Sequence, residues 1–316
     1  MDKTKFFTHR AVVVSFTLIC CLLWGSAFPC IKIGCGMFDI DSASTSSQIL
    51  FAGLRFLFAG IMAAVAGSIA ERRVLVPHRE EIPRVCLLSL FQTILQYTFF
   101  YIGLSHTTGM KSSVITASNV FLSIIVSAFV FRTEKLTSQK LVGCLTGFAG
   151  VILINLTRGS DLSFRFTGEG LVFLSALSYA FSASITKRFS SSTDPVLLSS
   201  WQFIIGGAFM IAVGLVSGGQ IGNAGIGGAA MLLYLAFISA AAFSLWSLLL
   251  KYNPVSSVSV FGFMNPVFGV ILSALLLSEK PPAGPLRTVA ALVLVAAGIV
   301  IVNGKVFVKK EDGADG

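Results

Sequence analysis

The chain has 316 residues, of which 55% are hydrophobic and only 12% are charged, and its formal net charge at pH 7 is +9. Soluble domains carry roughly 25% charged residues, and a mean hydropathy of +0.86 exceeds what one globular core of this length can bury. The composition therefore excludes a soluble globular domain and predicts an integral membrane protein.

Ten long apolar runs follow one another along the chain. Each is close to the roughly 20 residues that a helix needs to cross a hydrocarbon core of about 30 Å. A transmembrane barrel would instead show segments of about ten residues with alternating polarity. The pattern predicts an all-α integral membrane protein with ten transmembrane helices near residues 11–36, 47–70, 84–104, 108–131, 137–157, 168–187, 195–217, 229–250, 254–277 and 285–304.

The charges predict the topology of these helices. The first run is longer than the apolar region of a signal peptide, about 7–15 residues, and lacks a small-x-small cleavage site, so we expect it to be retained. With both termini in the cytoplasm, most of the 23 basic residues fall in cytoplasmic segments, as the positive-inside rule expects. The basic charge therefore indicates a multi-pass protein of the cell membrane (the inner membrane in a bacterium). We expect its partner to be the lipid bilayer and expect it to bind no nucleic acid.

The sequence contains an internal repeat. Because the matching blocks occur in the same order, residues 1–160 and 161–316 are expected to be equivalent five-helix units. A unit with an odd number of spans enters the membrane upside down the second time, and inverted repeats are typical of transporters with a central site. The matching blocks are Trp24–Lys32 with Tyr179–Lys187, Arg55–Gly67 with Gln202–Gly214, Asn119–Ala128 with Asn265–Ala274, and the segments ending at Asn155 and Asn303.

Several short motifs carry a more specific resemblance. They are WGSAF from Trp24 to Phe28, the triplet Leu54-Arg55-Phe56, Gly103-Leu104, and the N-x7-SA segments that precede Glu134-Lys135 and Glu279-Lys280. In this combination the chain resembles the drug/metabolite transporter superfamily, in particular its EamA family of ten-helix exporters. The resemblance implies a central cavity lined by helices 1, 3, 4, 6, 8 and 9. Members commonly have a proline in both helix 4 and helix 9, but here Pro266 is matched by Val120, so we expect the two halves to hinge unequally.

Ionisable groups inside the membrane are functional candidates by default. Arg55 falls well inside the second apolar run, where it could be a structural arginine or could bind a carboxylate of the substrate through its bidentate fork. All fourteen acidic residues fall in tails, loops or helix ends, so the sequence offers no carboxylate for a proton relay at mid-membrane depth.

Polar side chains at mid-membrane depth, together with aromatic ones on the helices that the resemblance marks as cavity-lining, are the candidate substrate contacts. Packing or a place in the interfacial aromatic belt is the alternative role for the aromatic residues. An aromatic and amide lining without carboxylates suits neutral, zwitterionic or weakly anionic metabolites. The candidates are Trp24, Arg55, Gln92, Gln96, Tyr97, Tyr101, Asn119, Tyr179, Ser182, Trp246 and Asn265, with Pro29, Pro266, Glu134 and Glu279 as candidate hinge or gate residues.

Other chemistries find no support in the sequence. The six cysteines lie in apolar runs without metal-ligand spacing, and no phosphate-binding glycine loop is present. We therefore expect no metal, no cofactor, no catalytic residue and no enzymatic activity. Gly143 and Gly147 form a G-x-x-x-G motif that could join two helices of one protomer or two protomers of a homodimer.

These observations favour a secondary transporter that exports small organic metabolites, such as amino acids, by alternating access between two inverted repeats. An uncoupled facilitator or channel for small solutes, or a multidrug efflux permease, is the alternative.

Overall fold

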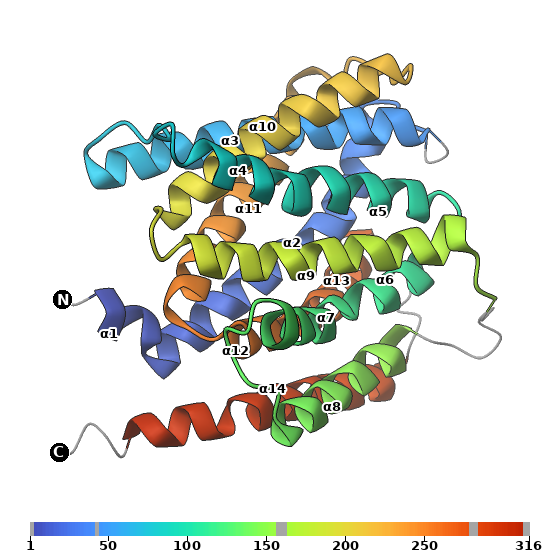
Figure 1. Cartoon of the computed structure of the whole chain (residues 1–316). Helices are drawn as coiled ribbons and strands as arrows, with labels where there is room; N and C mark the ends of the chain where they lie inside the picture. The colour runs from blue at the N-terminus through green and yellow to red at the C-terminus, as the bar shows by residue number, and fades with distance from the viewer. Residues whose placement is uncertain (1–2, 42–43, 156–162, 278–283, 312–316) are drawn as a thin grey trace.

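The computed structural model describes residues 3–41, 44–155, 163–277 and 284–311, and these residues form helices and no strand (Figure 1). Ten of the helical segments are long and apolar enough to cross a membrane. The predicted all-α fold with ten spans is confirmed, and the boundaries that the apolar runs indicated differ from the observed ones by only a few residues at most ends.

Six of the ten spans are single uninterrupted helices. Of the other four, the sixth span along the chain begins with a π-helical turn, and the third, fourth and ninth spans consist of shorter segments. In the first half the spans are α2 (Arg10–Met37), α3 (Thr45–Glu71), α4–η1–α5 (Ile82–Ser89, Leu90–Leu95, Gln96–Leu104), α6–α7–η2 (Gly109–Ala117, Asn119–Ile125, Val126–Val130) and α8 (Ser138–Asn155). In the second half they are η3–α9 (Phe166–Gly170, Leu171–Phe189), α10 (Pro195–Val216), α11 (Gly225–Tyr252), α12–η4–α13 (Val255–Ser259, Val260–Phe263, Met264–Leu277) and α14 (Pro285–Glu311).

Both ends of the chain lie at the same end of the bundle, where the short helix α1 (Lys3–Thr8) packs beside the start of α2 (Figure 1). We call this the termini end, and we call the opposite end, where α5, α8 and α13 finish, the far end. An even number of spans requires this arrangement. The side of the membrane that each end faces stays a prediction from the positive-inside rule.

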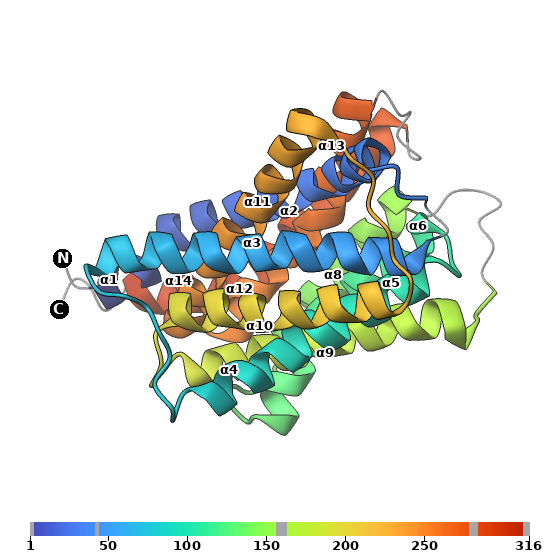
Figure 2. The same ribbon diagram turned by 90° about the horizontal axis from the view of Figure 1, so that it is seen from above.

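Glycines bring two pairs of helices into backbone contact. A Cβ atom added at Gly207 of α10 would lie 2.5 Å from the Leu57 nitrogen of α3, and α3 and α10 run side by side in Figure 2. On the other side of the bundle, a Cβ at Gly298 of α14 would lie 2.6 Å from the Gly143 oxygen of α8. The G-x-x-x-G motif of α8 therefore packs within one chain, and the homodimer stays an untested prediction.

The fourth and ninth spans are both interrupted near their middle. In the ninth, a 3-10 turn precedes α13, and Pro266 in the first turn of α13 has no N–H to donate to the preceding turn. In the fourth, the helix breaks at Ser118 between α6 and α7 although no proline is present. Asn119 and Asn265 are equivalent in the repeat, and each lies at the start of the helix after its break. The fourth span is thus interrupted even though it lacks the proline.

Candidate functional site

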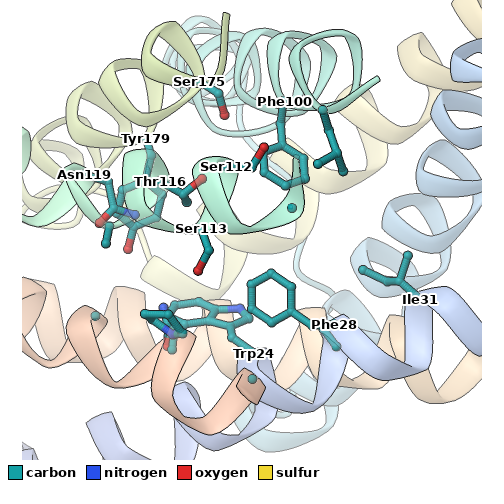
Figure 3. A pocket seen from close by; sticks show the side chains of 18 of the residues that line it. Trp24, Phe28, Ile31, Phe100, Ser112, Ser113, Thr116, Asn119, Ser175 and Tyr179 are labelled. Atoms are coloured by element: carbon teal, nitrogen blue, oxygen red, sulfur yellow. The ribbon is translucent and has the colours of Figure 1, made fainter. Parts of the chain in front are cut away.

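A cavity of about 480 Å³ lies at the centre of the bundle between the two halves of the chain (Figure 3). Its size is within the roughly 300–1,000 Å³ typical of ligand pockets. The lining side chains come from α2, α3, α5, α6, α7, α8, α9, α11 and α13, so both repeats contribute. They include Trp24, Ala27, Phe28, Ile31, Arg55, Gln96, Tyr97, Phe100, Tyr101, Leu104, Ser112, Ser113, Thr116, Asn119, Asn155, Ser175, Tyr179, Phe243, Asn265, Pro266 and Ser273.

The cavity extends from mid-membrane depth to the far end. Trp24 and Asn265 line it near the middle of their spans, whereas Leu104, Gly109 and Ala274 line it close to the far ends of α5, α6 and α13. No comparable extension toward the termini end is present in the described part of the chain. The protein is therefore in a state with its central cavity directed to one end of the bundle.

Nine of the predicted contact and hinge residues line this cavity: Trp24, Arg55, Gln96, Tyr97, Tyr101, Asn119, Tyr179, Asn265 and Pro266. Two repeat-related pairs, Trp24 with Tyr179 and Asn119 with Asn265, are among them. Figure 3 shows Asn119 and Tyr179 next to each other on one wall and Trp24 on the facing wall. Their roles in binding stay predictions, but the structure brings these nine side chains together around one space.

The remaining candidates lie elsewhere. Ser182 is fully buried and donates its hydroxyl hydrogen to the Tyr179 carbonyl of its own helix at 2.8 Å. Gln92 is buried in the π-helical turn η1 and Trp246 lies behind Trp24, while Pro29 is buried in α2, so none of these lines the cavity. Glu279 lies outside the described residues.

Arg55 brings a positive charge into the cavity wall. Its side chain is only 3% exposed, and both Nε and Nη2 donate to the Ser239 hydroxyl of α11, at 3.0 and 2.9 Å. The guanidinium carbon also lies 4.9 Å from the centre of the Phe56 ring. Among the described lining residues none is acidic, so the Arg55 guanidinium contacts a neutral hydroxyl and a ring face and no carboxylate of the lining balances its charge.

Several polar atoms of the lining have no hydrogen-bond partner among the described residues. They are Nε1 of Trp24, Oε1 of Gln96, Oγ of Ser112, Oγ1 of Thr116 and Oδ1 of Asn265. Buried polar groups are normally paired, and unpaired ones facing a cavity are available to a solute or to water. The cavity thus offers both donors and acceptors around an otherwise apolar space.

Aromatic rings form a connected layer at one side of the cavity. Trp24, Tyr97 and Phe243 line the cavity, and these rings contact Phe56, Phe203 and Trp246, which do not line it. Successive rings contact one another, so the wall is a packed layer and not a set of isolated side chains. The centroid distances are 4.9 Å for Trp246–Trp24, 5.0 Å for Trp24–Phe243, 4.9 Å for Phe243–Phe203, 5.1 Å for Phe203–Phe56 and 4.4 Å for Phe56–Tyr97.

The termini end is closed by packing and by hydrogen bonds between the two halves. Buried Val120, Ile124 and Phe261 belong to the core cluster that fills the space between the cavity and the termini end. Closer to the termini end, Glu134 accepts hydrogen bonds from the Ser256 amide at 2.9 Å and from the Ser256 hydroxyl, and it forms an ion pair with Lys140. Glu134 follows the fourth span and Ser256 begins the ninth, so this carboxylate joins the two interrupted spans.

Lys187 closes the same end at another point. Its Nζ donates to the carbonyl oxygens of Lys251 and Asn253, at 3.0 and 2.9 Å, where α11 finishes. A cation at a helix C-terminus satisfies carbonyls that have no helical donor. Lys187 therefore fastens the end of the sixth span to the end of the eighth.

Several ring and hydroxyl contributors to the lining were not predicted. Phe28, Phe100 and Phe243 could not be distinguished by residue type alone among the 28 phenylalanines of the chain. Ser112 and Thr116 do carry a signal, because with the predicted Asn119 they are polar residues three and four apart in an apolar run and so share one helix face.

Comparison with known proteins adds the family context. The model of the EamA-like transporter family matches residues 11–156 and 166–304. An uncharacterized transporter of Bacillus subtilis, YvbV, is 25% identical over 94% of this chain and 92% of its own length. A probable terminal-alkyne amino-acid exporter of Streptantibioticus cattleyicolor is 23% identical over 92% of this chain and 93% of its own.

A solved crystal structure with the same fold is among the similar proteins. It superposes with a TM-score of 0.75 at 16% identity, covering 93% of this chain and 96% of that one. At this identity the likeness concerns the fold alone.

Proposed function

The chain belongs to the EamA-like transporter family, and from this premise we propose that it is a secondary transporter that exports small organic metabolites, such as amino acids, across the cell membrane by alternating access. The family is one of transporters and not of enzymes. The name of the similar Streptantibioticus cattleyicolor protein, a probable amino-acid exporter, supports the choice of cargo.

The observation that carries the proposal is the cavity itself. It lies between two repeat-related residue pairs, reaches one end of the bundle, and is separated from the other end by buried side chains and by the Glu134–Ser256 contact. A carrier needs a central site that is open to one side at a time. A continuously open channel would instead need a path past Val120 and Phe261, both of which are buried.

The absence of acidic side chains from the described lining bears on the multidrug alternative. Organic cations buried in a membrane protein are normally paired with carboxylates. The lining here offers amides, hydroxyls, aromatic faces and one guanidinium, which suit neutral, zwitterionic or anionic solutes.

Purified protein in proteoliposomes tests the proposal. Vesicles loaded with an unlabelled amino acid should accumulate the labelled form from outside by counterflow, with saturation as its concentration rises. Flux that does not saturate and is not stimulated by internal substrate would show a channel and refute the carrier. Protein-free vesicles prepared in the same way control for leak.

A further inference from the structure

Arg55 is buried in the cavity wall with an incomplete set of partners. The Ser239 hydroxyl accepts from one edge of its guanidinium, and Ser239 in turn donates to the Leu235 carbonyl at 3.2 Å. A guanidinium has more N–H donors than one hydroxyl can accept. The remaining donors have no protein partner among the described residues, although the side chain lines the cavity.

The charge of Arg55 is equally unbalanced. An ionised group at this depth is costly unless it is paired, and no carboxylate of the described lining can pair with it. The fork of an arginine matches the two oxygens of a carboxylate. A solute that carries a carboxylate would therefore supply both the missing charge and the missing acceptors.

The rest of the lining differs in kind from this charged wall. Trp24, Phe28, Phe100 and Phe243 present apolar rings to the cavity, and the unpaired oxygens of Gln96 and Asn265 can accept hydrogen bonds. These neutral groups tolerate an amino group but do not require one. They provide no negative charge that an amine could use in place of a carboxylate.

We propose that the cavity recognises its cargo by the carboxylate, with Arg55 as the anchor, so that monocarboxylates with an apolar or aromatic body bind with or without an α-amino group, whereas the corresponding amines do not. The inference rests on the proposed function, because it takes the bound solute to be the one that is transported, and it adds the chemical class of that solute. Ser239 is a positioning residue that orients the guanidinium.

A matched series of four compounds tests the class: phenylalanine, hydrocinnamate, phenethylamine and phenylalaninamide. The first two carry a carboxylate and the last two do not, while all four share the ring and chain. Binding to the detergent-purified protein is read from tryptophan fluorescence, because Trp24 lines the cavity. Phenylalanine and hydrocinnamate should bind with affinities within about tenfold of each other, and the two compounds without a carboxylate should bind at least about 100-fold more weakly.

Variants then test the anchor. Arg55→Gln should weaken hydrocinnamate binding by about 10- to 100-fold. Ser239→Ala should weaken it less, and Ser239→Thr, which restores the hydroxyl, should recover most of the loss. Gln202 is a buried polar residue of α10 that does not line the cavity. The Gln202→Leu variant is therefore the control and should bind hydrocinnamate as the wild-type protein does.

The outcomes separate this inference from the proposed function. Equal binding of acids and amines by the wild-type protein overturns the inference, and that result needs no variant to fold. Binding of neither acid also overturns it. If the acids bind but counterflow is absent, the carrier proposal fails while the carboxylate site stands. If amines exchange as fast as acids, transport stands and the carboxylate site fails.

Discussion

Phe56 of α3 and Phe203 of α10, which align with each other in the internal repeat, stack on one another with ring centroids 5.1 Å apart and planes within 1° of parallel. Two equivalent residues can touch in this way only near the axis that relates the repeats. If the two halves are related as the sequence repeat predicts, their axis passes between α3 and α10, where the glycines of both helices allow backbone contact.

The first prediction concerns this contact. Gly207→Val should lower the free energy of unfolding by about 1–3 kcal/mol or more, because its side chain would meet the Leu57 backbone and push α10 from α3. Thermal unfolding in detergent measures the change. Gly227→Val, where a Cβ meets nothing within 4 Å, is the matched control. Equal melting temperatures for the two variants would contradict the account.

Glu134→Gln should loosen the closed termini end, because a neutral amide holds Ser256 and Lys140 more weakly than a carboxylate does. Cys21 is fully buried, and its thiol donates to the carbonyl oxygen of Phe261, one of the residues whose packing closes this end. In a protein with Cys21 as its single cysteine, maleimide labelling should become roughly tenfold faster in the variant. Glu71→Gln alters another acid at the same end, which pairs with Arg73, and should leave the rate unchanged. Unchanged labelling in Glu134→Gln would rule out a gating role for this carboxylate.

Pro266→Ala should slow counterflow by roughly tenfold or more. The substitution supplies the missing N–H and favours a continuous ninth span, by up to about 3 kcal/mol, so the break beside Asn265 becomes harder to maintain. Pro195→Ala is the control, because Pro195 is the first residue of α10, where no helical N–H bond is made. A Pro266→Ala protein that exchanges at the wild-type rate would show that the break is not used in transport.

Lys187→Met should destabilise the protein by about 1.5–3 kcal/mol, since it removes a charged donor from two carbonyl oxygens at the end of α11. The neighbouring Arg188 is exposed, so Arg188→Met should change the melting temperature little. Melting curves of the two variants side by side provide the measurement. Similar losses in both would mean that charge near the membrane surface, and not this capping contact, is responsible.

The sequence was sufficient to predict the spans, because each must match the thickness of the bilayer and satisfy its own backbone hydrogen bonds. It was less informative about helix rotation. Ser182 and Trp246 were placed at a suitable depth, yet Ser182 bonds within its own helix and Trp246 lies behind Trp24. Depth follows from counting residues, whereas the face that a residue presents depends on neighbouring helices that a hydropathy pattern does not identify.

The break in the fourth span shows a second limit. Val120 stands where a proline was expected, and the residue type gave no reason to interrupt the helix there. The structure nevertheless ends α6 at Ala117 and restarts at Asn119. A Cβ at Gly262 would lie 3.3 Å from Val120, so the breaks of the fourth and ninth spans meet in space. The interruption of the fourth span thus lies where it contacts the ninth, and a local sequence pattern does not record such a contact between distant segments.

The glycine contacts have a mechanical consequence. Each joins a helix of the first half to a helix of the second, α3 to α10 and α8 to α14, through backbone approaches too close for a side chain. If one half rocked as a rigid body against the other, both contacts would have to slide at once. We therefore expect the pairs α3–α10 and α8–α14 each to stay fixed, while the other helices that line the cavity move between them. On this view the unit of motion is a set of helices drawn from both repeats, and the boundary between the repeats in sequence is not the hinge in space.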